Sequence, residues 1–301
     1  MMAITQEFKN KVREALMTLR PNFDGADHAF AIKNGLNYSY YSQIKNGKID
    51  IGMSDGKWIA LARKLGVGDH NRKWNTVRTI VFNQIEEEVK FCQDASKAMI
   101  FVDECGIGKS YTAKYLSRTL NNCFYIDGSQ SRSKGQFIRS IAKELGLDYA
   151  DRTSDIKENI KYVLKVLAKP IIIIDEAGDL EYSTLLEIKE LWNATEGSCG
   201  WYMMGADGLK AKIEKGIKNK VVGFRELFSR FSSTYSYCVP TGRQEKIAFY
   251  QNITRVVIEA NIADKSNLDE MVRQCITKDA DGNISGLRRA ESLLIMNQQA
   301  H

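Results

Sequence analysis

The first 67 residues carry apolar positions at helical spacing. Apolar side chains recur every three or four positions over Phe8–Leu19, which predicts a helix with one buried face that Pro21 ends. A second short helix fits Asp27–Asn34, and a later one, capped by Ser54 and ending at Gly66, buries another apolar face. The segment therefore predicts a small all-helical unit.

The pattern changes after residue 75. An amphipathic helix is predicted from Thr76 to Cys92, with the acidic cluster Glu86–Glu88 on its polar side. Short apolar runs then alternate with helical patterns at 111–120 and 136–145, an order typical of an α/β fold with a parallel sheet. The predicted strands are Ala98–Val102, Cys123–Ile126, Ile171–Ile174 and Cys199–Met204.

Composition excludes several classes of protein. The 301 residues include only 3 Pro and 22 Gly, too few for a disordered chain. The longest apolar run, Ile171–Ile174, is far shorter than the ~20 residues that a membrane-spanning helix needs, and no signal peptide is recognisable. The 6 cysteines include no CxxC pair, which disfavours a zinc site. We therefore expect a cytoplasmic protein that makes no membrane contact.

The net charge of +6 is unevenly distributed along the chain. Residues 1–75 hold 12 basic and 7 acidic side chains, a balance of +5, whereas residues 76–240 carry about +1 and residues 241–301 are neutral. A basic unit attached to a near-neutral body favours a polyanion-binding appendage. An ordinary solvated surface is the alternative reading of the charge alone.

One spacing in the basic unit has a structural meaning. The residues that carry it are Ala31, Gly35, Leu36, Tyr41, Ser42, Ile44 and Gly47. The spacing resembles the helix-turn-helix of phage repressor and Cro proteins, which implies a turn at Gly35 and inward packing of Leu36, Tyr41 and Ile44. The face implied for the major groove of DNA is formed by Tyr38, Ser39, Tyr40, Gln43 and Lys45. The alternative is a helical docking module that binds protein.

The loop after the first predicted strand reads Asp103-Glu104-Cys105-Gly106-Ile107-Gly108-Lys109-Ser110. It matches the phosphate-binding P-loop except at its first position, where Asp103 replaces glycine. Gly106 and Gly108 let backbone N–H groups turn toward an anion, while Lys109 reaches the β and γ phosphates. The Ser110 hydroxyl is a predicted Mg²⁺ ligand. The predicted nucleotide-binding residues of this segment are Gly106, Ile107, Gly108, Lys109, Ser110 and Tyr111. A chance match or a non-hydrolysing relic is the alternative.

Two adjacent carboxylates follow the third predicted strand. Asp175 and Glu176 end the run Ile171–Ile174, whose four β-branched residues are typical of a strand buried on both faces. At the carboxyl end of such a strand Asp175 can bind the nucleotide's Mg²⁺ while Glu176 polarises the attacking water. Together with Lys109 and Ser110 this pair favours hydrolysis over passive binding.

Over residues 76–301 the chain resembles the AAA+ ATPases, through the P-loop and the Asp175-Glu176 pair. The resemblance implies ATP and Mg²⁺ as cofactors, and a P-loop α/β core with a small helical lid. Ser229-Arg230-Phe231 resembles the segment that offers an arginine finger in trans to the neighbouring subunit, and Arg225 is the second choice for that role.

Two further positions follow from the same resemblance. Arg288, more than Arg289, resembles the arginine of the second-sensor helix in the lid, which reaches the phosphates. Ala206, with Asp207 beside it, stands where the family often has an Asn that senses the γ-phosphate. The catalytic residues predicted in this way are Lys109, Glu176, Arg230 and Arg288.

These observations give a domain organisation. We predict a helix-turn-helix unit at 1–67, a polar linker at 68–75, an ATPase core at 76–240 and a helical lid at 241–301, with a hinge near Pro240.

This domain order most resembles the target-DNA-binding ATPases of transposition in Mu-like phages. The resemblance implies double-stranded DNA, further copies of the chain in a helical filament or ring, and a transposase as partners. It also implies DNA contacts from the core, for which Arg132 and Lys134 in a polar loop are candidates. Two alternatives remain open: a helicase-loader-like ATPase, and an ATP-responsive transcription regulator.

Overall fold

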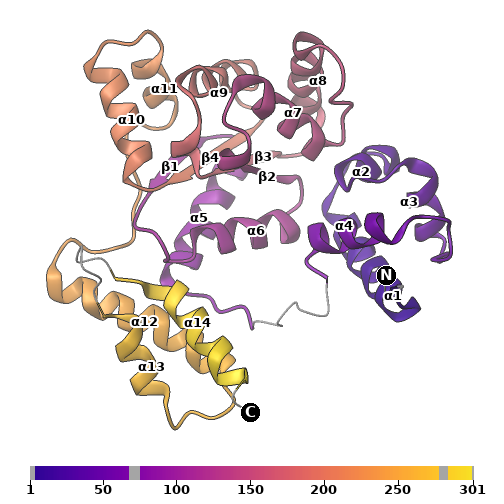
Figure 1. Cartoon of the computed structure of the whole chain (residues 1–301). Coiled ribbons are helices and arrows are strands. Elements are labelled where there is room, and N and C mark those ends of the chain that lie inside the picture. The colour runs from indigo at the N-terminus through magenta and orange to yellow at the C-terminus, as the bar shows by residue number, and fades with distance from the viewer. Residues whose placement is uncertain (1–3, 68–74, 278–283, 300–301) are drawn as a thin grey trace.

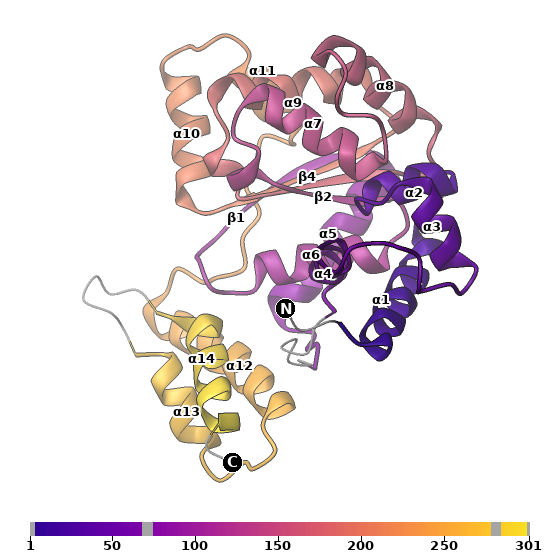
Figure 2. The same cartoon turned by 45° about the vertical axis from the view of Figure 1, so that its right-hand side comes forward.

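The computed structural model describes residues 4–67, 75–277 and 284–299, and these form an α/β core between two helical units (Figure 1). In that figure the N-terminal unit lies to the right of the core and the C-terminal helices lie below it at the left. A view turned by 45° keeps the two helical units apart (Figure 2). The predicted fold class is confirmed in these elements.

A parallel sheet is the centre of the core. Its strands within the described residues follow the order β1-β4-β3-β2, and every neighbouring pair is parallel. The strands are β1 (Ala98–Val102), β2 (Cys123–Asp127), β3 (Ile171–Asp175) and β4 (Gly200–Gly205). All four lie within one residue of their predicted bounds. Phe101 of the edge strand β1 also forms an isolated parallel β-bridge with Ser236.

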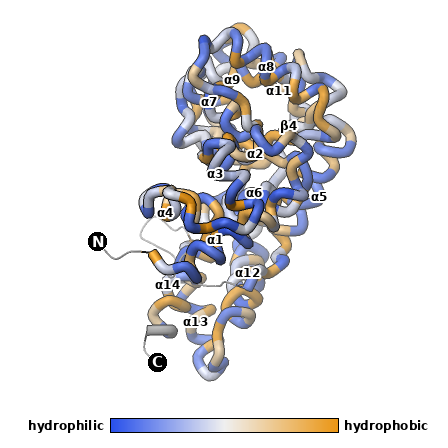
Figure 3. Tube along the Cα trace, turned by 90° about the vertical axis from the view of Figure 1, so that its right-hand side faces the viewer, coloured by the Kyte–Doolittle hydropathy of each residue, from blue (hydrophilic) through white to orange (hydrophobic). Residues whose placement is uncertain are grey.

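Side chains of β3 alternate between the two faces of the sheet, because successive residues of a strand point in opposite directions. Ile171 and Ile173 belong to one hydrophobic cluster, and Ile172 and Ile174 belong to another. All four are fully buried, as predicted for a strand covered on both sides. The hydropathy colouring of Figure 3 shows orange, hydrophobic segments in the interior of the core around the label of β4.

Helices cover both faces of the sheet (Figure 1). One face is covered by α5 (Ile80–Ala95) and α6 (Lys109–Thr119). The other is covered by α7 (Lys134–Leu145), α8 (Thr153–Val166), α9 (Tyr182–Ala194), α10 (Asp207–Lys218) and α11 (Phe224–Arg230). Short 3-10 turns lie at η2 (Gly128–Gln130) and η3 (Ala177–Asp179), both after the carboxyl ends of strands.

The acidic cluster predicted on the polar side of the first core helix is not a solvated face. Thr79 caps α5, so the helix begins later than predicted, and its hydroxyl accepts the N–H of Phe82. Glu86 is buried and pairs with Arg78 and Lys90. Glu88 accepts the hydroxyl of the buried Tyr202 at 2.6 Å, so two of the three acids have partners.

The N-terminal unit contains α1 (Gln6–Leu19), η1 (Arg20–Asn22), α2 (Asp27–Lys33), α3 (Tyr38–Lys45) and α4 (Asp55–Leu65). Gly35 adopts φ 73° in the turn between α2 and α3, a conformation that favours glycine. Leu36, Tyr41 and Ile44 are buried, as their spacing predicts. One detail differs: Ser54 precedes α4, but its side chain makes no capping hydrogen bond.

The N-terminal unit packs against the core. The Phe23 ring meets Phe124 of β2 edge to face at a centroid distance of 6.4 Å. The Asp24 carboxylate accepts hydrogen bonds from the side chains of Asn121, at 3.0 Å, and Asn122, at 2.7 Å. The predicted linker, apart from Asn75, lies outside the described residues. The two parts therefore share one hydrophobic cluster, which the expectation of a tethered module did not include.

The C-terminal helices are α12 (Arg243–Asn261), α13 (Leu268–Cys275) and α14 (Gly286–Gln299). They pack together in a cluster of their own that includes Ile258 and Leu294. Gly242 precedes α12 and supplies no side-chain cap. Within the described ranges, no helix combines the length and apolar character needed to cross a membrane.

Candidate active site

The P-loop connects β1 to α6 with two glycines in the left-handed region. Gly106 has φ 77° and Gly108 has φ 103°, and Gly108 is the residue that precedes α6. Neither conformation suits a residue with a Cβ. The loop therefore directs backbone N–H groups toward the amino end of α6, where an anion is stabilised.

Lys109 lies across the P-loop. Its side chain is 8% exposed, and its Nζ donates to the carbonyl oxygens of Asp103, at 2.7 Å, and Glu104, at 2.6 Å. Burial lowers the pKa of Lys109, while the nearby Cys105 and Asp103 oppose that shift. Both hydrogen-bond acceptors are neutral, so the ammonium charge is held in the loop without a direct ion pair.

Asp175 and Glu176 leave β3 in different environments. Asp175 is buried, with Oδ2 accepting the Tyr125 hydroxyl at 3.0 Å and Oδ1 accepting the Glu176 N–H at 3.0 Å. Glu176 is exposed and has φ 48°, a left-handed conformation that turns the chain sharply after the strand. Partial burial raises the pKa of Glu176, and the charge of Asp175 raises it further. The first acid is fixed, and the second faces the pocket.

These residues fit a Mg²⁺ that arrives with a nucleotide. Ser110 and Asp175 supply hard oxygen donors on neighbouring elements. Within the described residues no group of three or more His, Cys, Asp or Glu side chains is placed to hold a metal on its own. Mg²⁺ is commonly bound by one or two protein ligands together with water and substrate phosphates, and the donor set matches that pattern.

A pocket of about 350 Å³ opens beside the P-loop. Seven residues predicted from the sequence line it: Gly106, Gly108, Lys109, Ser110, Tyr111, Glu176 and Arg288. Two predicted binding residues do not, because Ile107 is buried under the loop and Asp175 is buried beneath Glu176. The P-loop, the end of β3 and the C-terminal helices thus converge on one cavity.

Sequence patterns did not predict the apolar part of the pocket lining. It includes Val77, Phe82, Val257 and Leu294. Asn75 also lines the pocket, with its N–H donating to Asn261 Oδ1 at 2.7 Å and its Nδ2 to the carbonyl of Ala260 at 2.6 Å. These residues come from the entry to the core and from the C-terminal helices, so no local spacing connects them.

The two sensor positions differ in the structure. Arg288 lines the pocket from α14, and the Leu287 N–H beside it donates to the Gly106 carbonyl at 3.0 Å. Ala206 also lines the pocket, but it offers only a methyl group, and Asp207 begins α10 without being part of the lining.

Family comparison identifies this part of the chain. A model described as AAA domain matches residues 93–213. The chain contains an AAA domain. The matched segment includes the P-loop, β3 and the Asp175–Glu176 pair.

Two relatives extend the similarity beyond the AAA domain. Both are named ATP-dependent target DNA activator B, one from Escherichia phage Mu and one from Escherichia phage D108. Each is 25% identical to this chain over 228 residues, which cover 73% of this chain and 71% of the relative. The resemblance to AAA+ ATPases and to the transposition ATPases of Mu-like phages is thereby confirmed, whereas the helix-turn-helix resemblance of the N-terminal unit stays a prediction.

Arg230 lies outside the pocket of its own AAA domain. Its Nε donates to Asn193 Oδ1 at 3.1 Å, and its guanidinium lies 5.0 Å from the centre of the Trp192 ring. Arg225 is exposed on the same helix, α11. The structure therefore does not bring either arginine to the pocket of the same chain.

The predicted groove-reading residues form the outer face of α3. Tyr38 and Ser39 are exposed, while Tyr40 and Gln43 are half-buried. Gln43 Nε2 reaches back to the Ser39 carbonyl at 3.3 Å. Lys45 Nζ is paired with Asp27 Oδ2 at 2.6 Å, so its charge is already partly satisfied within the unit.

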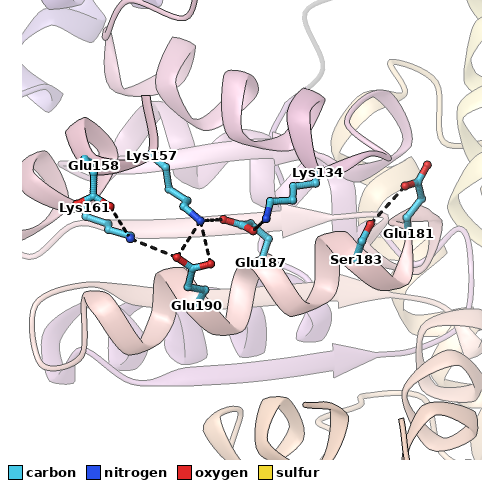
Figure 4. Close-up of polar contacts among 8 residues, drawn as sticks. All are labelled: Lys134, Lys157, Glu158, Lys161, Glu181, Ser183, Glu187 and Glu190. Carbon is cyan, nitrogen blue, oxygen red and sulfur yellow. Dashed lines mark hydrogen bonds and ion pairs between the residues drawn. The ribbon is translucent and has the colours of Figure 1, made fainter. Parts of the chain in front are cut away.

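The two basic residues proposed for the core also have acidic partners. Lys134 Nζ lies 2.6 Å from Glu187 Oε2, and the buried Glu187 also binds Lys157 (Figure 4). Arg132 lies 3.6 Å from Asp179. Lys134 begins α7, which is about 18 Å long, and the N-terminal unit contacts the other end of that helix. The two predicted DNA-binding groups therefore lie apart.

Proposed function

We propose that this chain is a Mg²⁺-dependent ATPase that binds DNA and acts in transposition. The observation that carries the ATPase proposal is the convergence of Lys109, Ser110, Glu176 and Arg288 on one pocket from three separate elements. The AAA domain and the similarity to two ATP-dependent phage proteins support it.

Each residue has a role that follows from its position. Lys109 and the loop N–H groups hold the phosphates, and Arg288 approaches them from α14. Ser110 and Asp175 would hold the Mg²⁺, which neutralises phosphate charge when it is bound. Glu176 accepts a proton from the attacking water, because its carboxylate faces the pocket and is not engaged as Asp175 is. Arg230 completes the site of a neighbouring subunit.

The nucleotide proposal is tested by Lys109→Ala. We expect ATP affinity to fall at least 100-fold, because the ammonium next to the phosphates is removed from a buried site. Lys165→Ala, at an exposed position on α8, is the matched control. Isothermal titration with ATP and Mg²⁺ measures both, and wild-type affinity in Lys109→Ala would remove the P-loop from the proposal.

The DNA proposal rests on the two named relatives and on α3. We infer that the chain assembles on double-stranded DNA with ATP, in a filament or a ring, and delivers that DNA to a transposase. In this assembly α3 faces the major groove, and the Arg132–Lys134 loop adds sequence-tolerant phosphate contacts from each subunit.

Charge reversal tests the core contacts. Arg132→Glu with Lys134→Glu is expected to abolish ATP-dependent duplex binding, with the exposed pair Lys97→Glu and Lys165→Glu as the control. Footprinting on a long duplex distinguishes the functions. Diffuse protection supports target-DNA binding, whereas one protected site supports a transcription regulator that uses the exposed face of α3.

A further inference from the structure

The residue that replaces the first P-loop glycine has its own partners. Asp103 is buried, and its Oδ2 accepts the backbone N–H groups of Cys238, at 2.6 Å, and Val239, at 3.0 Å. Its Oδ1 accepts the N–H of Glu104 at 2.8 Å. Residues 238 and 239 lead directly into Pro240, where the chain leaves the core for α12. The carboxylate thus joins the start of the P-loop to the exit of the core.

The next residue of the loop reaches the C-terminal helices. Glu104 Oε2 accepts the Tyr250 hydroxyl at 2.8 Å, and Oε1 pairs with the ammonium of Lys246. Lys246 and Tyr250 lie four residues apart on α12, so they present both donors on one face. Tyr250 is fully buried, and burial, with the contact to Glu104, raises its pKa. Its hydroxyl therefore remains a proton donor.

A third contact, independent of the two carboxylates, joins the same loop to α14. The Leu287 N–H donates to the Gly106 carbonyl at 3.0 Å. The fit is close, since a Cβ on Gly106 would lie 3.1 Å from the Ser285 carbonyl oxygen and one on Gly286 would lie 2.8 Å from the Tyr250 ring. Both α12 and α14 therefore contact the P-loop within residues 103–106. Leu287 and Arg288 of α14 line the pocket.

We propose that Asp103 and Glu104 form a clasp that positions the C-terminal helices over the nucleotide pocket, so that nucleotide affinity depends on these two carboxylates. The inference rests on the proposed ATPase function, and the two acids are positioning residues rather than catalytic ones.

The electrostatics of the loop explain why these acids are tolerated beside phosphates. Two carboxylates next to a polyanion site would repel the ligand if they were free. Asp103 is instead satisfied by three N–H groups, and Glu104 by a cation and a hydroxyl. Loss of the clasp leaves an unpaired acid near the phosphates and also releases α14 with Arg288. Both effects weaken nucleotide binding.

Three variants test the clasp. Asp103→Gly restores the ordinary P-loop residue, so the loop itself tolerates the change, and Glu104→Gln removes the charge that pairs with Lys246. Asp103→Asn keeps one acceptor oxygen and is the conservative rescue. The matched control is Glu259→Gln, which removes an acid from α12 that pairs with Lys265 away from the loop.

Two readouts are needed. Hydrogen exchange of the nucleotide-free protein reports the Leu287 N–H and the rest of residues 284–294, whose hydrogen bonds do not involve either substituted side chain. Titration with ATP, together with steady-state kinetics, reports Kd, KM and kcat. We expect roughly tenfold faster exchange at 284–294 and a roughly tenfold higher Kd and KM in Asp103→Gly and Glu104→Gln, with a smaller change in kcat. Asp103→Asn, which keeps an acceptor for Cys238 and Val239, should fall between Asp103→Gly and the wild type, and Glu259→Gln should stay near the wild type.

The outcomes separate the two proposals. If the wild type binds no ATP, the proposed function fails, while the exchange experiment still decides whether the clasp exists. If exchange rises only at Cys238 and Val239 and remains unchanged at 284–294, the clasp is wrong. An unchanged Kd in Asp103→Gly, measured on a wild type that does bind ATP, overturns the coupling of the clasp to the nucleotide.

Discussion

The nucleotide edge of the core and the basic surfaces differ in how their residues are held together. At the nucleotide edge, residues of the P-loop, of the turn after β3 and of α14 meet around one pocket. The candidates for DNA contact lie in two places, at α3 and at the start of α7, and Lys45, Arg132 and Lys134 each have an acidic neighbour. The first region has a defined geometry, and the second has mainly charge.

The difference reflects what each ligand demands. A nucleotide phosphate requires inward N–H groups and glycines in left-handed conformations, which few sequences satisfy by chance. Binding to a DNA backbone requires cations near the surface, and an ordinary solvated surface also provides these. A motif that specifies backbone conformation is therefore stronger support for a site than a local excess of charge.

We expect the largest effect when the proposed base, Glu176, is removed from the nucleotide edge. Glu176→Gln should lower the ATP hydrolysis rate by about 100-fold or more while ATP affinity changes little, because the amide cannot accept the proton of the attacking water. Glu181→Gln, at an exposed acid before α9, is the control. Phosphate release measures the rate. A wild-type hydrolysis rate in Glu176→Gln would show that Glu176 is not the base and would leave only nucleotide binding assigned to the nucleotide edge.

A second prediction concerns the boundary between the N-terminal unit, which carries α3, and the core. Asp24→Ala removes the acceptor of both Asn121 and Asn122 and leaves the buried Asn122 amide without that partner. We expect a loss of about 1–3 kcal/mol in the free energy of unfolding. Urea unfolding compares it with Asp50→Ala, which changes an exposed acid of the same unit. Equal stability of the two variants would show that the N-terminal unit gains nothing from this contact.

The pH dependence of hydrolysis sharpens the assignment of Glu176. Burial and the charge of Asp175 raise the pKa of Glu176 above its usual value of 4.5, and a base must be ionised to act. The rate should therefore fall as the pH decreases through this raised pKa, about tenfold per unit below it. Rates measured at saturating ATP between about pH 5 and pH 8 locate the acidic side of the pH–rate profile. A fall in rate centred on the ordinary pKa of glutamate would contradict the raised pKa of Glu176.

Sequence patterns predicted the strands, the P-loop and the buried face of α3, because each depends on neighbouring residues. The four-isoleucine run specifies a buried strand, and the glycines at 106 and 108 specify a loop with left-handed backbone conformations. Contacts between distant segments had no such signal. The apolar lining of the pocket includes both Val77 and Leu294, and the buried contact of Phe23 with Phe124 joins two predicted domains.

Asp103 shows how a departure from a motif can hide its reason. From the sequence it is only a missing glycine, whereas the structure supplies the N–H groups of residues 238 and 239 as its partners.

The acidic run of α5 was misread for a similar reason. Glu86 and Glu88 follow the polar side of a helical pattern, but each has a partner outside that helix, Arg78 and Tyr202 respectively.

The smallest expected effect tests whether α3 belongs to a site at all. Hydrogen bonds from Lys45 and Arg20 lower the pKa of Asp27, so its stabilising effect is present above the unfolded pKa and is lost as the pH falls through the folded one. At neutral pH, Asp27→Asn should release the Lys45 ammonium with little change in shape. If that ammonium contacts phosphate, affinity for duplex DNA at low salt should rise a few-fold and the salt slope should steepen by about one ion. Asp50→Asn, which removes an exposed acid without freeing Lys45, separates this effect from a general change in charge. Equal affinities of the two variants across a salt series would remove Lys45 from the DNA surface, and α3 would then depend on its hydroxyl and amide groups alone.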